Sequence, residues 1–228
     1  MKTLRILLFI GLMSVGSHTA FGQVDASSLI GKLLENSKAV QSFEADVDIQ
    51  VDVDFIRIPV KKGRVFYKAP DKFKFRATGF VLVPKKGLNF TFNEMLSSEH
   101  AAIYAGADSL NHIVKIVPLG EDTDFALATA WIDKMRSRVN RLDVTTKGQG
   151  NYSLYFEYGN LSFDLPVSTR VHFEIGQIDI PMKFIGSLKV DKKKAGERSS
   201  GNVTLHYSNF IINRQIADAI FTENDNIR

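Results

Sequence analysis

The chain has 228 residues, 44% of them hydrophobic, and a formal net charge of +4 at pH 7. This length accommodates one large β domain or two small ones. The absence of cysteine excludes disulfide bonds, a cysteine nucleophile and a lipid attached to an N-terminal cysteine, so an ordinary apolar core must hold the fold.

Residues 1–22 are predicted to be a cleavable signal peptide. Lys2 and Arg5 precede an apolar run that is too short to cross a bilayer, and a small–spacer–small triplet then places cleavage before Gln23. Removal of this segment lowers the formal charge from +4 to +2, so the charge does not indicate a nucleic-acid partner. We therefore expect residues 23–228 to form a single exported domain, and export without cysteine favours a periplasmic location.

A helix is predicted over residues 26–41. Ile30, Leu33 and Val40 fall on one face of this segment, as in an amphipathic helix that packs on a core. Asp25 is the expected N-cap, because its carboxylate can accept hydrogen bonds from the first amides of the helix.

The clearest strand is predicted over residues 43–55, where apolar and polar residues alternate. The apolar positions are Phe43, Ala45, Val47, Ile49, Val51, Val53 and Phe55. The acidic positions are Glu44, Asp46, Asp48, Asp52 and Asp54. Carboxylates spaced along an extended strand diverge, whereas a calcium loop makes them converge. We therefore interpret the acidic row as a solvated outer face and the apolar row as the inner face of a large curved sheet.

Further short strands are predicted up to the C-terminus. They lie at residues 64–68, 72–76, 80–84, 89–93, 101–105, 112–117, 125–132, 138–146, 152–158, 169–175, 182–190 and 202–212. Residues 148–151 form a hairpin turn, residues 93–98 a short helix or loop, and residues 192–201 a polar loop. Many strands joined by short turns indicate an antiparallel barrel, half-barrel or sandwich.

The segment at residues 125–132 carries conflicting signals. Its alanines favour a helix by propensity. Phe125, Leu127 and Trp131, however, lie on one side at a period of two, with small residues on the other. We therefore predict a strand.

Motifs for catalysis, metal binding or cofactor binding are missing from the sequence. Four histidines follow the signal peptide, at His100, His112, His172 and His206, and none has the short spacing of a local metal pair. Nucleophile-elbow, phosphate-loop and dinucleotide-binding patterns do not occur. We expect no catalytic residues, no metal and no cofactor, and a hydrolase is a poor fit.

Aromatic residues are abundant, with 17 phenylalanines in the chain. Several cluster within one stretch of predicted strands, at Phe66, Phe73, Phe75, Phe80, Phe90 and Phe92. Most of them must be core, but a single curved sheet encloses more apolar surface than one helix can cover. Such sheets commonly leave a cavity for a ligand.

Several short motifs occur in a characteristic order. The predicted helix runs into Val40-Gln41-Ser42-Phe43-Glu44-Ala45, and residues 63–75 read GRVFYKAPDKFKF. Trp131-Ile132-Asp133 and Asn209-Phe210 follow later. In this order the chain resembles the LolA-like periplasmic lipoprotein carrier family, whose members show a V-x-S-F-x-A entry and a strand ending in K-R-P-x-x-F-x-W.

The resemblance has specific departures. Ala69 stands where the family has an arginine that helps to hold the lid shut, and Phe75 stands where tryptophan is usual, whereas the aromatic at Phe73 is retained. The resemblance implies an open antiparallel β half-barrel, mainly β, with an N-terminal helix and short covering helices. It further implies an apolar cavity that shields acyl chains, without catalysis.

Strand parity and the resemblance together predict the ligand-binding residues of this cavity. They are Phe43, Val47, Ile49, Val51, Phe66, Phe73 and Phe75. The predicted function is a carrier or chaperone for lipid or lipoprotein acyl chains, with envelope membrane proteins as further partners. A ligand-sensing or protein-interaction module on the same scaffold is the alternative, and the sequence leaves the cargo open.

Overall fold

The computed structural model of the chain describes residues 24–53, 56–57, 59–77, 96, 99–120, 123, 125–147, 151–175, 189–190 and 199–222. The predicted signal peptide, the predicted strands at residues 80–84 and 89–93, most of the predicted strand at residues 182–190 and most of the predicted turn at residues 148–151 lie outside them.

The N-terminal helix, α1, spans Ala26–Ser37 and buries Ala26, Ile30 and Leu33. Asp25 caps it as predicted, because its two carboxylate oxygens accept hydrogen bonds from the amides of Ser27 and Ser28, each at 3.1 Å. The helix ends four residues before the predicted boundary of residue 41, since the chain turns there to enter the first strand.

Within the described residues, twelve strands form one sheet and all of their pairings are antiparallel. They are β1 (Ser42–Val53), β2 (Ile56–Arg57), β3 (Lys61–Lys68), β4 (Lys72–Ala77), β5 (His100–Ala107), β6 (Asn111–Pro118), β7 (Phe125–Asp133), β8 (Val139–Thr146), β9 (Asn151–Tyr158), β10 (Pro166–Ile175), β11 (Lys189–Val190) and β12 (Ser199–Ile212). A short helix, α4 (Ala219–Thr222), follows β12. The strand order is β11-β2-β1-β12-β10-β9-β8-β7-β6-β5, with β3 paired to β1 and β4. The sheet is open, which confirms the predicted fold class.

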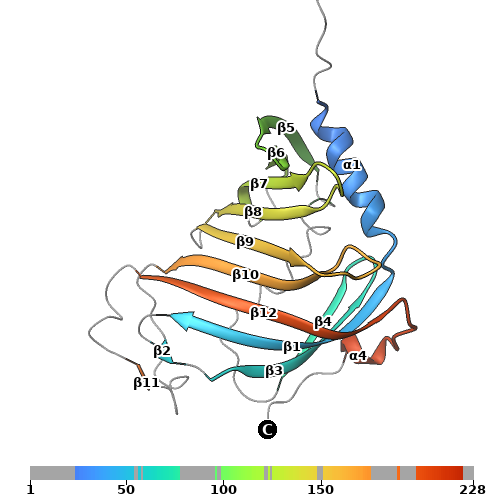
Figure 1. Ribbon diagram of the computed structural model, residues 1–228, viewed down its shortest axis with the longest axis vertical. Coiled ribbons are helices and arrows are strands. Elements are labelled where there is room, and N and C mark those ends of the chain that lie inside the picture. Colours follow the sequence, from blue (N-terminus) through green and yellow to red (C-terminus); the bar gives the residue numbers. More distant parts are fainter. Residues whose placement is uncertain are drawn as a thin grey trace, which may run out of the picture.

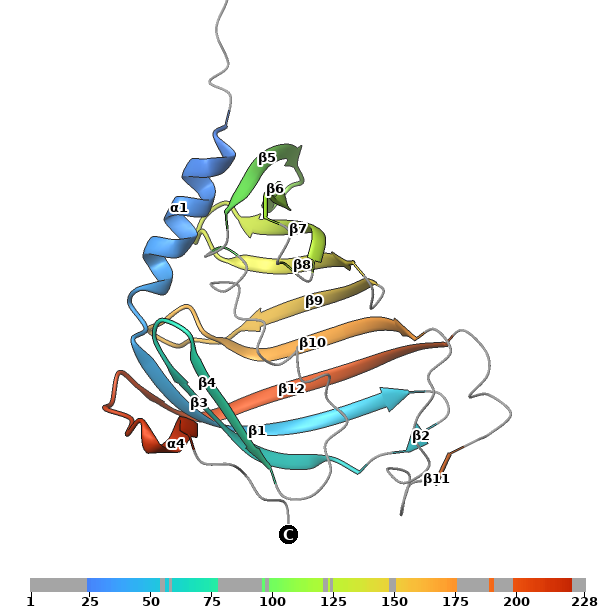
Figure 2. The ribbon, with the colours of Figure 1, turned by 180° about the vertical axis from the view of Figure 1, so that it is seen from behind.

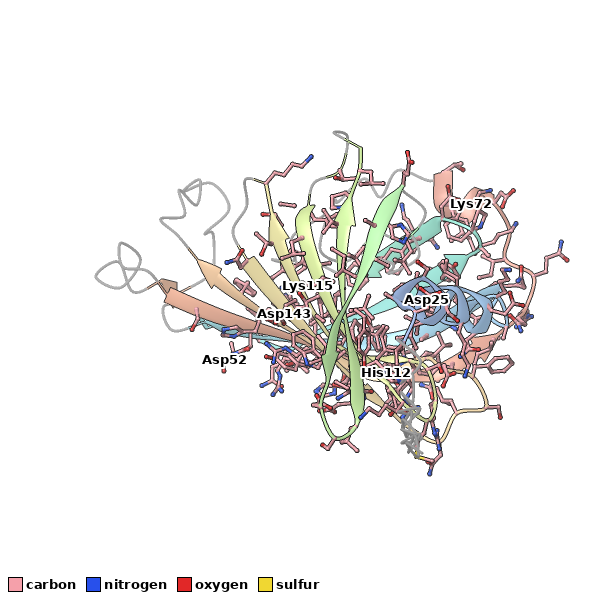
Figure 3. The ribbon with its side chains drawn as sticks, turned by 90° about the horizontal axis from the view of Figure 1, so that it is seen from above. Asp25, Asp52, Lys72, His112, Lys115 and Asp143 are labelled. Carbon is pink, nitrogen blue, oxygen red and sulfur yellow. The ribbon has the colours of Figure 1, made fainter. Side chains whose placement is uncertain are left out.

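The sheet is strongly twisted and curved. Figure 1 shows it fanning from β5 and β6 at the top to β1 and β3 at the bottom, with α1 running beside the upper strands and α4 at the lower edge. From behind, the β3–β4 hairpin curls back over β1 and β12 (Figure 2). Seen from above, Asp25 marks the start of α1 on one side, and Asp52 lies at the far end of β1 (Figure 3).

Cross-strand partners in an antiparallel sheet project to the same face, so the register defines two faces across the whole sheet. One row, on what we call the inner face, contains Val51, Val203, Val171, Leu154, Leu142, Ala130, Val114 and Tyr104. The neighbouring row, on the outer face, contains Gln50, Thr204, Arg170, Tyr155, Arg141, Trp131 and Ile113. The side chains of Ile30 and Leu33 in α1 pack on the inner face, in one cluster with Leu142.

The strand assignment tests two further sequence predictions. Residues 125–133 are a strand as predicted, and Ala128 and Ala130 lie fully buried on the inner face. The predicted loop at residues 192–201 is wrong for its last three residues, which belong to β12. They extend the strand because their backbones pair with β10, and that of Gly201 also pairs with β1.

Candidate functional site

The lower half of the inner face carries a close-packed apolar cluster, which we call the floor. It consists of Ala45, Val47, Ile49, Val51, Val65, Val203 and Leu205. The alternation of β1 predicted this arrangement, since every second residue of the strand must project to the same side. Val47 and Ile49 retain 1% and 0% of their accessible surface, so the floor is covered by other side chains.

Aromatic side chains pack against the floor, and we call them the aromatic rim. It consists of the half-buried side chains of Phe43, Phe73, Phe75, Phe173, Tyr207 and Phe210, all packed against the floor. Phe43 lies 5.4 Å from Tyr67 and 6.2 Å from Phe210, measured between ring centroids. Phe210 in turn lies 6.3 Å from Tyr207. These spacings are in the range of favourable aromatic pairs, so Phe43, Phe210 and Tyr207 form a connected aromatic row within the rim.

The structure brings six of the seven predicted site residues together. Val47, Ile49 and Val51 lie in the floor, and Phe43, Phe73 and Phe75 lie in the aromatic rim. Whether these residues bind a ligand remains a prediction.

Phe66 is the exception, and its placement on the concave face was wrong. Its cross-strand partners are Glu44 and Lys74, whereas Val65 and Tyr67 on either side of it pair with Ala45 and Phe43 of the inner face. Phe66 therefore projects to the outer face, where it is buried and the guanidinium of Arg76 lies 5.5 Å from its ring centroid.

Sequence reasoning missed three members of the rim: Phe173, Tyr207 and Phe210. For Tyr207 the signal was present, because Val203, Leu205 and Tyr207 alternate within β12. Phe210 breaks this alternation and reaches the inner face only because β12 contains a bulge at Asn209, whose φ is 52°. The side-chain amide of Asn209 donates a hydrogen bond of 2.8 Å to Asp46, which fixes the bulge against β1.

Gly63 makes room for one ring of the rim. It pairs with Val47 of β1, and a Cβ atom built on it would lie 2.8 Å from the ring of Phe75 and 2.6 Å from the carbonyl oxygen of Arg76. A side chain cannot occupy this space without displacing the ring or the backbone. The glycine therefore allows Phe75 to lie across β3.

One polar group is enclosed in the rim. Burial raises the pKa of Tyr207 to about 12, and a hydrogen bond between its hydroxyl and Thr169 only partly offsets this shift. The tyrosine is therefore neutral at physiological pH and adds no charge to the rim.

The predicted acidic row lies on the opposite, outer face of β1. The Arg64 guanidinium lies 3.3 Å from the Glu44 carboxylate and 3.7 Å from that of Asp46. Asp48 is half-buried, Asp52 is exposed, and Asp54 lies outside the described residues. Among the residues that the structure describes, no group of three or more histidine or acidic side chains is placed to hold a metal ion.

The outer face of the other half of the sheet carries a ladder of aromatic rings and guanidinium groups. Arg141 lies 4.4 Å from the ring of Trp131 and 5.3 Å from that of Tyr155, and Arg170 lies 5.1 Å from Tyr155. Arg141 also donates two hydrogen bonds to Asp143, at 2.8 and 2.7 Å. The two faces thus differ in chemistry: the inner face is apolar and the outer face is charged.

Two of the described histidines form hydrogen bonds within the sheet. Tyr104 and His112 form a hydrogen bond of 3.2 Å between the hydroxyl and Nδ1, and His172 forms one of 3.0 Å with Asn202. Both pairs join neighbouring strands.

No described helix is long and apolar enough to span a bilayer.

These features define a class: an open, curved antiparallel sheet with a helix packed on its inner face and aromatic side chains packed against an apolar floor. Solved structures of LolA-like proteins share this fold. A crystal structure of a LolA superfamily protein from Nitrosomonas europaea matches with a TM-score of 0.59 and 14% identity, over 88% of this chain and 99% of that one.

Two further solved structures share the fold. A putative outer membrane lipoprotein-sorting protein domain from Vibrio parahaemolyticus matches with a TM-score of 0.56 and 8% identity, over 87% of this chain and 97% of that one. A DUF1329 family protein from Desulfovibrio piger matches with a TM-score of 0.54 and 12% identity, over 89% of this chain and 99% of that one. No protein-family model and no curated protein matches the chain. At these identities the likeness establishes the fold.

Proposed function

We propose that the protein is a periplasmic carrier or chaperone that shields lipid or lipoprotein acyl chains against the aromatic rim. The observation that carries the proposal is the arrangement of the inner face, in which half-buried aromatic side chains pack against a floor that is itself almost completely buried. Two of the solved structures with this fold bear names that refer to the LolA superfamily and to lipoprotein sorting.

The floor and the aromatic rim would have different roles in binding. The floor is almost completely buried, and Val47 and Ile49 would support the site without touching the ligand. The rim side chains retain accessible surface, and aromatic rings present large apolar contact areas. An acyl chain would therefore lie on the rim, between the β3–β4 hairpin and β12.

The free energy available from such contact is sufficient. Burial of one methylene group is worth roughly 0.8 kcal/mol, so a chain of about 15 methylenes gains roughly 12 kcal/mol. A micromolar dissociation constant requires about 8 kcal/mol, which leaves about 4 kcal/mol for the cost of association. Micromolar binding thus requires the protein to cover most of one acyl chain.

The same proposal accounts for the location and the partners. The predicted signal peptide directs export, the cargo is lipid or lipoprotein acyl chains, and inner- or outer-membrane proteins of the envelope would deliver or receive it. The site requires no catalysis and no cofactor, because transfer of a lipid between apolar surfaces breaks no bond.

Binding of a fluorescent fatty-acyl probe tests the proposal. The Phe73→Ser variant should bind the probe about tenfold more weakly or worse, since it removes an apolar contact and places a hydroxyl where the chain would lie. The matched control is Tyr155→Ser, which removes an aromatic ring from the outer face and should leave probe binding unchanged. Circular dichroism must show the same β-sheet spectrum for all three proteins.

Native mass spectrometry of the purified protein supplies a second readout. Co-purified lipid supports the carrier. A wild-type protein that binds neither lipid nor the acyl probe, but captures an envelope protein, would instead support the interaction module.

A further inference from the structure

Two touching turns at one end of the sheet each expose a large apolar side chain. Leu110, between β5 and β6, retains 69% of its accessible surface, and Met135, between β7 and β8, retains 93%. The two turns touch, because the amide of Lys134 donates a hydrogen bond of 2.9 Å to the carbonyl oxygen of Leu110. The ammonium group of Lys134 also donates to the carbonyl oxygen of Asp108. We call residues 108–110 and 134–136 the apex.

The apex is held in one conformation by its own hydrogen bonds. A carboxylate oxygen of Asp108 accepts from the amide of Leu110 at 2.8 Å. A carboxylate oxygen of Asp133 accepts from the amides of Met135 and Arg136, both at 2.8 Å. The exposed side chains are therefore presented on braced turns, and little backbone order would be lost if a partner covered them.

The apex is also tied to the helix. The side-chain amide of Asn36, near the end of α1, donates to the carbonyl oxygens of Arg136 and Ser137, at 3.4 and 3.3 Å. The strand register places the start of β1 and the end of β12 at this same end of the sheet. Phe43 and Phe210 of the aromatic rim thus lie toward the end that carries the apex.

Single exposed apolar residues are ordinary on protein surfaces, whereas a pair on two touching turns is a feature that needs an explanation. Leu119 shows the ordinary case, because it is 60% exposed at the opposite end of β6. Lys134 and Arg136 flank Met135, and both are exposed. Long cationic side chains beside an apolar tip can reach lipid phosphates while the tip enters the acyl region.

We propose that the apex is a docking surface for a phospholipid bilayer. Leu110 and Met135 enter the boundary between headgroups and acyl chains, and Lys134 and Arg136 contact phosphate groups. The carboxylates of Asp108 and Asp133 balance the two cations, so apolar insertion supplies most of the binding and anionic lipid adds to it. The inference deepens the carrier function and rests on it, because a carrier docked on a bilayer lies beside the proteins and acyl chains with which it exchanges cargo.

A single cysteine at the apex provides a direct test, since the protein has none of its own. Met135→Cys and Leu119→Cys are each labelled with an environment-sensitive nitrobenzoxadiazole dye and mixed with vesicles of phosphatidylglycerol and phosphatidylcholine. The label at residue 135 should shift to the blue and brighten, whereas the label at residue 119 should not change. An unchanged label at residue 135, or equal changes at both positions, overturns the proposal.

Vesicle co-sedimentation of unlabelled protein supplies the second arm. The double variant Leu110→Ser/Met135→Ser should partition into vesicles at least about tenfold more weakly than the wild type, because burial of one such side chain alone is worth about that factor. Leu119→Ser should partition like the wild type. If the double variant sediments like the wild type, or if the apex captures a protein while the wild type ignores vesicles, the bilayer is not its partner.

These assays distinguish a failure of the apex proposal from a failure of the proposed function. The double variant should bind the soluble acyl probe as tightly as the wild type. A wild type that docks on vesicles but binds no acyl probe refutes the proposed function and leaves the apex assignment standing.

Discussion

A substitution in the floor should lower the stability of the fold without changing ligand affinity, whereas a substitution in the rim should lower ligand affinity. Ile49→Ala tests the floor. Ile49 has no accessible surface and pairs with Leu205 of β12. The substitution removes three carbon atoms, worth about 2.4 kcal/mol in transfer at roughly 0.8 kcal/mol each. The residual cavity adds to this, so we expect the free energy of unfolding to fall by about 3 kcal/mol.

Urea denaturation followed by circular dichroism measures this loss, and the acyl-probe titration is run on the same variant in the absence of urea. Probe affinity should stay within about twofold of the wild type, since the rim, which makes the contacts, is unchanged. A loss of stability below about 1 kcal/mol together with tighter probe binding would refute the layering. That result would mean that the ligand already reaches β1 and that the floor is part of the cavity.

Three smaller perturbations follow from the same region. Asn213→Ala should lower the free energy of unfolding in urea by about 2 kcal/mol. Asn213 has a φ of 57°, and its side chain accepts a hydrogen bond from the amide of Gln41 at 2.7 Å and donates one to the carbonyl oxygen of Ala39 at 2.9 Å. Asn213→Gly should lower the free energy of unfolding by less, because glycine adopts a positive φ without strain. Gly63→Ala should weaken acyl-probe binding by displacing Phe75, and a full-affinity variant would contradict the packing described. Because the folded-state pKa of Tyr207, about 12, exceeds its unfolded value, its contribution to stability is complete below pH 10 and is lost as the pH rises toward 12. Tyr207→Phe should flatten that part of the stability profile, measured by denaturation between these pH values.

The sequence predicted which side chains of β1 project to the inner face, because the two faces of this strand differ sharply in polarity. Thirteen alternating residues allow one register only, and the structure follows it from Ala45 to Val51. Phe66 was assigned to the wrong face because it is followed by Tyr67, and two adjacent aromatics leave the parity of a short strand undetermined. Pairing with β1 decides it, and pairing is a contact between distant parts of the chain.

The rest of the rim depends on contacts of still longer range. Phe173 joins it only because β10 lies beside β12, a neighbour that the order of strands along the sequence does not specify. Phe210 joins it through a bulge that one asparagine introduces at a positive φ. Local patterns predict which residues are apolar, whereas register and bulges decide which of them meet.

The C-terminal segment after β12 braces the β3–β4 hairpin that carries Phe73 and Phe75. The Asp218 carboxylate lies 2.6 Å from the ammonium group of Lys68 and 3.1 Å from that of Lys72. Lys68 also donates to the carbonyl oxygen of Ile216, at 3.3 Å. These two lysines stand at the end of β3 and the start of β4, next to the turn of the hairpin.

Asp218→Asn should therefore release this brace. Hydrogen bonds from Lys68 and then Lys72, together with their positive charges, lower the pKa of the Asp218 carboxyl. A lowered folded-state pKa means that the ion pairs stabilise the fold above the ordinary carboxyl pKa and are lost as the pH falls through the lowered value. At neutral pH the variant should be cleaved faster by a protease within residues 214–222, with little change in overall stability because the pairs are exposed. Asp71→Asn, which removes an exposed carboxylate from the β3–β4 turn itself, should be cleaved like the wild type. The wild type should become as sensitive as Asp218→Asn at acidic pH with an acid-stable protease, and equal cleavage of wild type and variant at neutral pH would show that the ion pairs do not hold the segment in place.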